Sequence, residues 1–201
     1  MMFSIIIPAY NAAGHIRKAL ESVKAQDFDD YELIVVCDSC TDDTEQIAKE
    51  YGARTATVNF NRDGLTRNVG INMAQGRYIL FMDDDDHWLH EYVLTMLFNM
   101  IVLNDADIIA FAFIWKGRGY ASPQHDGGLF YPAVWNKCYK RSIIGDTRFG
   151  DEWSVSDLPF TQALFAKKPK IFAWNMPFYY YNYMRKGSIT ERDSHEPCTK
   201  D

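Results

Sequence analysis

The stretch RYILFMDDDDHW, residues 77–88, decides how the rest of the chain can fold. Its first part, residues 78–82, is a short apolar run of the kind that forms a buried strand. Four consecutive carboxylates follow that run: Asp83, Asp84, Asp85 and Asp86. In an open α/β sheet, ligands bind outside the carboxyl ends of the strands. The stretch therefore predicts a polar site at one edge of a sheet.

The four neighbouring carboxylates repel one another, and a bound cation would offset that repulsion. Two unit charges about 4 Å apart repel by roughly 1 kcal/mol in water, and by more beside a low-dielectric wall. Mg²⁺ binds one or two carboxylates and keeps its other positions for water and phosphate oxygens. The alternative is a solvated acidic cap on the helix expected from about Leu89, since carboxylates favour helix N-termini. A cap needs only one acid, so we favour a divalent cation.

The composition favours one domain and argues against several classes of protein. The chain has 201 residues, 47% of them hydrophobic, which is enough for one substantial core. Its net charge is −6 and no basic stripe is visible, which argues against nucleic-acid binding. No apolar run approaches the roughly 20 residues of a membrane span, and the N-terminus lacks the features of a signal peptide. We expect a cytoplasmic protein, with peripheral attachment to the inner face of the membrane left open.

The cysteine content fits a reducing compartment. The chain contains Cys37, Cys40, Cys138 and Cys198, which predict no disulfide framework. Cys37 and Cys40 form a C-x-x-C, for which zinc binding and redox chemistry are alternatives. A zinc site needs two more ligands at regular spacing, and the other cysteines and the five histidines do not offer them. We favour a chance substitution, and prompt disulfide formation under mild oxidant would overturn this interpretation.

Apolar runs alternate with helical patterns through the first half of the chain. Strands are predicted over residues 3–7, 32–36, 55–59 and 78–82, with helices over residues 12–25, 41–52 and 65–74 between them. The connections are too long for hairpins, so we predict an α/β fold with a mainly parallel central sheet and helices on both faces. The turn at residues 8–11, Asp38 and the four carboxylates would share one edge of that sheet. They would form a nucleotide-sized crevice there.

The second half is rich in aromatic residues. Residues 106–115 predict a buried strand, residues 117–128 a polar loop, and residues 170–174 and 178–183 two further strands. Residues 193–201 form a polar tail that we expect to be disordered. We predict a single domain over residues 1–192.

Four collinear blocks carry a resemblance to a known family: SIIIPAYN (4–11), YELIVVCDSCTDDT (31–44), NRDGLTRNVGINMAQGRYILFMDDDDHW (61–88) and VWNKCYKRSIIGDTRF (134–149). Together they resemble the family-2 glycosyltransferases, inverting enzymes of the GT-A fold, many of which build bacterial surface polysaccharides. The resemblance covers most of residues 3–160. It implies a GT-A-like nucleotide-diphospho-sugar transferase fold, with a nucleotide-sugar half to about residue 115 and an acceptor and base half from about residue 116. Three residues depart from the family pattern. Cys37 stands where the pattern has Asp, Cys40 where it has Ser or Thr, and Asp84 where it has Ser.

The resemblance implies roles for the polar groups at this edge. It assigns nucleotide binding to Pro8, Ala9, Tyr10, Asn11, Asp38, Arg67 and Asp84. Asp38 would accept a hydrogen bond from the uracil imide N–H. Asp83 and Asp85 would hold a Mg²⁺ or Mn²⁺ ion, with Asp86 as the best further ligand. For Arg67, a solvated helix cation is the alternative.

The acceptor hydroxyl must lose a proton during transfer, and a positioned carboxylate can take it. The resemblance implies that Asp157, within DEWSVSDLPF (151–160), is this base. Ser156 stands where the family pattern has Glu. A helix start near Asp157 is an alternative interpretation, and Asp151 and Glu152 are competing bases.

Weaker signals concern the rest of the site. The segment at residues 184–192 resembles a mobile family segment, which makes Arg185, Lys186 and Ser188 candidate contacts to the diphosphate. Three tryptophans could stack on sugar faces, with a core position as the alternative: Trp88, Trp135 and Trp153. His87 could approach the metal, although we favour surface positions for His87 and His90.

We predict a metal-dependent glycosyltransferase that moves a sugar from a UDP-sugar, with inversion, to a glycan or lipid-linked glycan. One rival is a nucleotide-sugar-binding module that has lost turnover, which the serine at position 156 motivates. A receiver-like phosphoacceptor domain is a third alternative, but its compact βα repeat does not fit the aromatic second half. Family members often continue with further helices, so we expect either a small acceptor site or a further segment.

Overall fold

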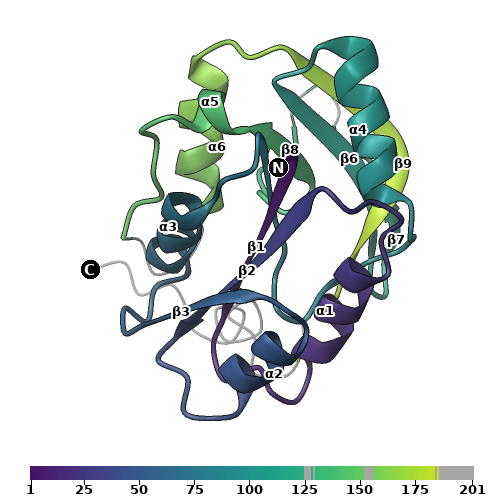
Figure 1. Ribbon diagram of the computed structural model, residues 1–201. Coiled ribbons are helices and arrows are strands. Elements are labelled where there is room, and N and C mark those ends of the chain that lie inside the picture. Colours follow the sequence, from purple (N-terminus) through teal and green to yellow (C-terminus); the bar gives the residue numbers. More distant parts are fainter. Residues whose placement is uncertain (125–127, 129, 152–155, 184, 186–201) are drawn as a thin grey trace.

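A computed structural model describes residues 1–124, 128, 130–151, 156–183 and 185, and these residues build one mixed sheet with helices around it (Figure 1). The strand order is β3-β2-β1-β4-β8-β6-β9-β5, and β7 pairs with β6. The strands are β1 (Phe3–Ala9), β2 (Tyr31–Asp38), β3 (Arg54–Val58), β4 (Tyr78–Phe81), β5 (His87–Trp88), β6 (Ile108–Trp115), β7 (Gly119–Ala121), β8 (Lys137–Lys140) and β9 (Ile171–Tyr181). The helices are α1 (Ile16–Lys24), α2 (Thr44–Glu50), α3 (Asp63–Met73), α4 (Val93–Asn104), α5 (Arg141–Ile144) and α6 (Asp157–Ala166).

The long strands point the same way. β1 runs parallel to β2 and β4, and β2 runs parallel to β3. β8 lies antiparallel between β4 and β6, and β9 is parallel to β6. The carboxyl ends of β1, β2, β4, β6 and β9 therefore share one edge, as predicted for an α/β fold of this kind.

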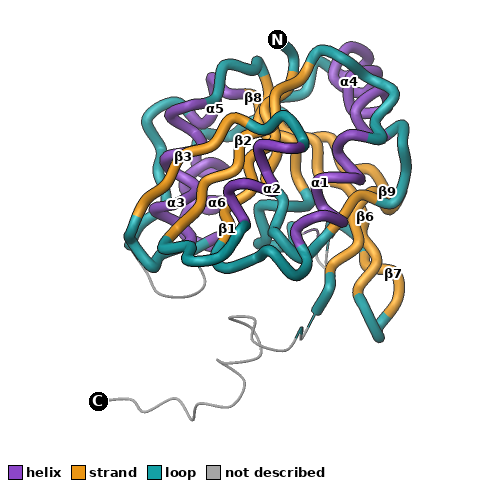
Figure 2. Tube along the Cα trace, turned by 60° about the horizontal axis from the view of Figure 1, so that its bottom comes forward, coloured by secondary structure: helices purple, strands orange, loops and turns teal. Residues whose placement is uncertain are grey.

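Helices cover both faces of the sheet because the side chains of each strand alternate between them. On β1, Ile5 and Ile7 pack into a core with α1, α2 and α4, whereas Ile6 packs into a second core with α3, α5 and α6. Figure 1 shows α3, α5 and α6 together on one side of the strands. α3 lies close against β1, since a Cβ atom at Gly70 would come within 2.3 Å of Ile6. Figure 2 shows the hairpin of β6 and β7 extending from the body.

Several elements differ from the sequence prediction. The helix expected from about Leu89 begins at Val93, because His87 and Trp88 instead form β5 against β9. The acidic turn is thus separated from α4 and does not cap it. The two strands expected over residues 170–183 are one strand, β9, whose register against β6 shifts between Phe111 and Phe113. Within the described part of the chain, no helix is both long and apolar enough to cross a lipid bilayer.

Candidate active site

The turn after β1 and the acidic turn after β4 meet at the carboxyl edge of the sheet. The backbone N–H of Tyr10 donates to Asp84 Oδ2 at 3.3 Å, and His15 Nε2 lies 3.1 Å from Asp84 Oδ1. On the other side of the β1 turn, the N–H of Thr41 donates to Asn11 Oδ1 at 2.8 Å. The residues predicted from the two turns are therefore brought together.

Asp38 ends β2 at the same edge and organises the loop before α3. Its Oδ1 accepts from the N–H groups of Phe60 and Asn61 at 2.8 and 3.0 Å, and its Oδ2 accepts from the Arg62 N–H and the Thr66 hydroxyl at 3.0 and 2.7 Å. Burial alone would raise the pKa of Asp38, but these hydrogen bonds lower it. A carboxylate has about four lone-pair sites, and these donors use them. Asp38 therefore fixes the loop before α3 at this edge, and its hydrogen bond to a uracil imide stays a prediction.

Asp85 lies beside a cation from the C-terminal part of the chain. Arg185 Nε donates to Asp85 Oδ2 at 2.5 Å. Burial and the neighbouring Asp84 raise the pKa of Asp85. Arg185 thus lies next to the predicted metal ligand, where a diphosphate contact was expected. The other two residues predicted from this segment, Lys186 and Ser188, lie outside the described residues.

Asp86 is bound by groups of β9 and the residue that follows it. Its side chain is fully buried, Oδ2 accepts from the Tyr179 hydroxyl and Oδ1 from the Asn182 N–H, both at 2.7 Å. Burial, followed by the charges of Asp83 and Asp85, raises the pKa of Asp86 well above its usual value. The two oxygens of Asp86 thus tie the acidic turn to β9, and its role as a further metal ligand stays a prediction.

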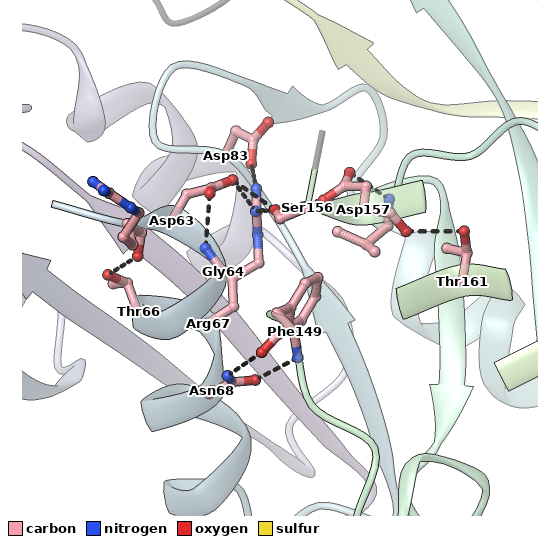
Figure 3. A network of polar contacts seen from close by, with 12 residues as sticks. Asp63, Gly64, Thr66, Arg67, Asn68, Asp83, Phe149, Ser156, Asp157 and Thr161 are labelled. Carbon is pink, nitrogen blue, oxygen red and sulfur yellow. Dashed lines mark hydrogen bonds and ion pairs between the residues drawn. The ribbon is translucent and has the colours of Figure 1, made fainter. Parts of the chain in front are cut away.

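The guanidinium of Arg67 lies among three carboxylates (Figure 3). Nη1 donates to Asp63 Oδ2 at 2.5 Å, Nη2 donates to Asp83 Oδ1 at 2.8 Å, and Nη1 is 3.4 Å from Asp157 Oδ1. Only 5% of the Arg67 side chain is exposed. Burial alone would lower the pKa of Arg67, but the three carboxylates raise it and keep the group charged. The solvated-cation interpretation of Arg67 is therefore wrong.

Asp157 begins α6, yet its carboxylate is directed to the loop before β8. The N–H of Val134 donates to Asp157 Oδ2 at 3.0 Å, and Oδ1 faces Arg67. Ser156, the N-cap residue, makes no side-chain cap hydrogen bond; its hydroxyl donates to Asp63 Oδ2 at 3.1 Å. A capping role therefore does not account for either side chain.

Of the two competing bases, Asp151 lies among the described residues. It is exposed, and Arg62 Nε donates a hydrogen bond to its backbone carbonyl at 3.1 Å. Glu152 lies outside the described residues, as does Trp153. Among the described candidates, Asp157 is the carboxylate that reaches Arg67.

Burial sets the electrostatics of the site. It raises the pKa of Asp83 to about 7, against the opposing effect of Arg67. It also raises the pKa of Asp157, again with Arg67 opposing. Both carboxylates therefore exchange protons nearer neutral pH than a surface aspartate does.

The donor set fits a cation held by few protein ligands. In the described parts of the chain, no three Asp, Glu, His or Cys side chains are grouped as a ligand set. Asp83 and Asp85 remain as two partly buried carboxylates on one turn, with raised pKa values that a nearby positive charge would lower. Mg²⁺ and similar ions suit one or two carboxylates completed by water and phosphate oxygens. The residues present thus fit such an ion and do not form an all-protein cage.

The two predicted sugar-stacking tryptophans that the structure describes, Trp88 and Trp135, are core residues. Trp88 and Trp135 are each 4% exposed, and Trp135 stacks on Tyr179 with ring centroids 4.7 Å apart. His87 packs on Tyr180, and burial lowers the pKa of His87 to about 4. The core interpretation therefore holds for both tryptophans, and His87 packs against β9.

Sequence reasoning missed two groups of this site. Asp63 lies four residues before Arg67 on α3, and this i,i+4 spacing of opposite charges was visible in the sequence. Lys137 is fully buried at the start of β8, and its ammonium donates to the carbonyls of Tyr131 and Ala133 at 2.5 and 2.6 Å. Burial lowers the pKa of Lys137 to about 7. No local pattern in the sequence indicated that this lysine is buried.

A separate hollow lies far from these groups. It has a volume of about 320 Å³ and is lined by residues that include Tyr31, Tyr51 and Arg54. These residues lie near the amino ends of β2 and β3, whereas the carboxylates lie at the carboxyl edge. The hollow therefore takes no part in the site.

Sequence comparisons connect this geometry to known proteins. A family model described as Glycosyl transferase family 2 matches residues 4–171. Glycosyltransferase GlyA of Streptococcus pneumoniae is 27% identical over 218 residues, covering 93% of this chain and 31% of GlyA. Poly(ribitol-phosphate) beta-N-acetylglucosaminyltransferase TarS of Staphylococcus aureus is 28% identical over 211 residues, covering 93% of this chain and 36% of TarS. The chain thus spans about a third of the length of these relatives.

Solved structures share the fold. The crystal structure of S. aureus TarS 1-349 in complex with UDP-GlcNAc matches with a TM-score of 0.86 and 25% identity, covering 95% of this chain and 61% of that chain. Glucosyl-3-phosphoglycerate synthase from Mycobacterium tuberculosis, in complex with Mn²⁺, UDP and phosphoglyceric acid, matches with a TM-score of 0.67 and 16% identity, covering 96% of this chain and 73% of that chain. At that identity the second match shows the fold alone. The predicted fold class is confirmed.

Proposed function

Since the chain belongs to glycosyl transferase family 2, we propose that it transfers a sugar from a UDP-sugar, with inversion, to a hydroxyl of a glycan or lipid-linked glycan. The UDP-sugar part of this proposal draws on TarS, which was crystallised with UDP-GlcNAc. The acceptor part draws on relatives such as TarS, a poly(ribitol-phosphate) beta-N-acetylglucosaminyltransferase by name.

The observation that carries the proposal is the position of Arg67. Its guanidinium contacts Asp83, on the acidic turn after β4, and lies 3.4 Å from Asp157, at the start of α6. One group thereby holds the proposed donor side and the proposed base side in a fixed relation. A transferase needs such an arrangement because donor and acceptor must meet in one geometry.

The leaving diphosphate gains negative charge as the bond to the sugar breaks. Asp83 and Asp85 would hold a Mg²⁺ or Mn²⁺ ion, which as a Lewis acid stabilises that charge. Arg185, paired with Asp85, places a second positive charge at the same turn. The exposed Tyr10 and the backbone of the turn after β1 would line the nucleotide side, together with Asn11 and Asp84.

Asp157 is the proposed base. The Val134 N–H fixes its Oδ2, and Oδ1 lies toward Arg67 at 3.4 Å. Burial raises the pKa of Asp157, which makes the carboxylate a stronger base, while Arg67 keeps it ionised before transfer. A general base of this kind contributes typically about 10²–10⁴-fold in rate. Ser156 bonds to Asp63, so its side chain supports the carboxylate group around Arg67.

Calorimetric titration tests the nucleotide and metal parts first. UDP is titrated into the purified chain with Mn²⁺ and then with EDTA, and CDP and dTDP serve as controls. We expect Mn²⁺-dependent binding that favours UDP. Equal binding of all three nucleotides, or binding unaffected by EDTA, would contradict the proposal that the carboxyl edge of the sheet binds UDP and a metal ion.

A turnover assay separates the enzyme from the rival binding module. Release of UDP from UDP-sugars is measured with candidate polyol-phosphate and glycan acceptors. Acceptor-dependent release supports the transferase. Tight UDP binding without release from any donor and acceptor pair would favour a binding module, for which the serine at position 156 is the motivating feature.

A further inference from the structure

The Cys37–Cys40 pair has no part in the mechanism above, yet it lies at the same edge of the sheet. Cys37 is the penultimate residue of β2 and is fully buried, whereas Cys40 is partly exposed in the loop before α2. Between them Ser39 adopts a left-handed conformation, φ 55°, which turns the chain back on itself. The two side chains belong to one packed cluster.

Cys40 also contacts the turn that the proposed function assigns to the nucleotide. Its Sγ donates to the Ala9 carbonyl and accepts from the Asn11 N–H, each at 3.4 Å. Ala9 is the direct partner of Cys37 across β1 and β2. The sulfur of Cys40 therefore lies beside the residue that pairs with Cys37.

The two thiols have different chemical characters. The neighbouring Cys37 side chain lowers the pKa of the Cys40 thiol to about 7, whereas the Cys40 side chain and burial raise the pKa of Cys37. A partly exposed cysteine with a lowered pKa is the attacking member of a reactive pair, because the thiolate is the nucleophile. The buried Cys37 is suited to resolve the first adduct.

We propose that Cys37 and Cys40 are a reactive dithiol that small-molecule disulfides convert to an intramolecular disulfide, and that this modification weakens nucleotide binding at the adjoining turn. The Cys40 thiolate attacks a disulfide RSSR, forms a mixed disulfide and releases RS⁻. The Cys37 thiol then loses its proton and attacks the Cys40 sulfur, which releases a second RS⁻. Two protein thiols and RSSR thus give one protein disulfide and two RSH.

The disulfide changes the turn because it draws the Cys40 sulfur toward β2. The sulfur then moves away from the Ala9 carbonyl and the Asn11 N–H, which it contacts in the reduced chain. The turn keeps its other ties, including Thr41 to Asn11 at 2.8 Å and the Ala12 N–H to Thr44 at 2.7 Å. We therefore expect displacement and not unfolding. Loss of one such hydrogen bond corresponds to about a three- to tenfold fall in affinity.

The test uses the full chain with Cys138→Ser and Cys198→Ser, so that only the pair remains. Oxidised glutathione is the probe, thiols are counted, and the tryptic peptide over residues 25–49, which holds both cysteines, is weighed. We expect loss of both thiols and a peptide lighter by two hydrogen atoms. A stable glutathione adduct, or two surviving thiols, overturns the proposal. If this background variant does not fold, the natural chain gives the same peptide.

The coupling to the nucleotide rests on the proposed function and has two readouts. UDP affinity should fall three- to tenfold on oxidation and recover with dithiothreitol, whereas in Cys40→Ser, which keeps a hydroxyl at this position, the affinity should be the same with and without oxidant. Amide exchange at Asn11 should also become faster on oxidation. Unchanged affinity and unchanged exchange overturn the coupling. A reduced chain that binds no UDP contradicts the proposed function instead, and the exchange at Asn11 then decides the coupling alone.

Discussion

Replacing Arg67 with methionine tests the charge arrangement at the centre of the site. Removing one partner of a buried ion pair typically costs about 3–5 kcal/mol. The three partners Asp63, Asp83 and Asp157 are 26, 28 and 21% exposed, so water can solvate them in part. We therefore expect the lower end, about 3 kcal/mol at pH 8. For a domain of this size that corresponds to a fall in Tm of about 6–12 °C.

The loss of unfolding free energy in Arg67→Met should become smaller as the pH falls. Burial raises the pKa of Asp83 to about 7, so this carboxylate binds a proton more tightly in the folded than in the unfolded chain. Its charge therefore opposes folding in full above pH 7, and that penalty shrinks as the pH falls from 7 toward the unfolded value of about 3.9. Without Arg67 the penalty is larger, so the difference between Arg67→Met and the natural chain should shrink from pH 8 to pH 5.5.

Urea denaturation at both pH values measures this difference. Arg17→Met is the matched control, because Arg17 is 51% exposed and its Glu50 pair at 3.7 Å lies on the surface. Such pairs contribute about 0–1 kcal/mol. Arg67→Lys keeps the charge but not the several N–H donors of the guanidinium, so its free energy of unfolding should fall by an intermediate amount. A loss in Arg67→Met that is equal at pH 8 and pH 5.5 would refute the charge argument and assign the effect to packing on Phe149.

Three further predictions concern the reaction. Asp157→Asn should lower turnover about 10²–10⁴-fold and leave UDP affinity unchanged; full turnover would move the base to another residue. In the natural chain, kcat/KM should decrease at acid pH with an apparent pKa above the usual aspartate value of about 3.9, because burial raises the pKa of Asp157. If the residual activity of Asp157→Asn shows the same decrease, the titrating group is another residue. Asp85→Asn should weaken Mn²⁺-dependent UDP binding in calorimetry, whereas Asp86→Asn should retain it; the reverse order would identify Asp86 as a ligand.

The parts of the fold that the sequence predicted well are those with local signals. β1, β2 and β4 are continuous apolar runs, and each was placed within a few residues of its observed bounds. β5 has two residues and exists because His87 and Trp88 pair with Tyr180 and Tyr179. β8 has lysine at both ends, and no apolar period indicates it. Short strands of this kind depend on partners distant in the chain, so a local pattern cannot reveal them.

The same distinction applies to the site. The acidic turn and its position after β4 followed from the sequence, but the direction of each carboxylate did not. Asp86 is bound by Tyr179 and Asn182, more than 90 residues away in the chain. A surface position was an open alternative for Arg67 because one of its partners, Asp157, belongs to α6 and is distant in the chain. Asp63 is the exception, since its spacing to Arg67 was local and could have been used.

The antiparallel insertion of β8 explains how a base from the second half reaches the carboxylates of the first. β8 pairs antiparallel with β4, with Leu80 opposite Cys138 and Tyr78 opposite Lys140. The amino end of β8 therefore lies beside the carboxyl end of β4, and the loop before it, which contains Val134, is brought to the site edge. Lys137, the first residue of β8, donates to the carbonyls of Tyr131 and Ala133 in that loop, and the Val134 N–H donates to Asp157. A parallel strand at this position would place the loop at the opposite edge of the sheet, so the strand direction, together with the buried lysine, sets where Asp157 can act.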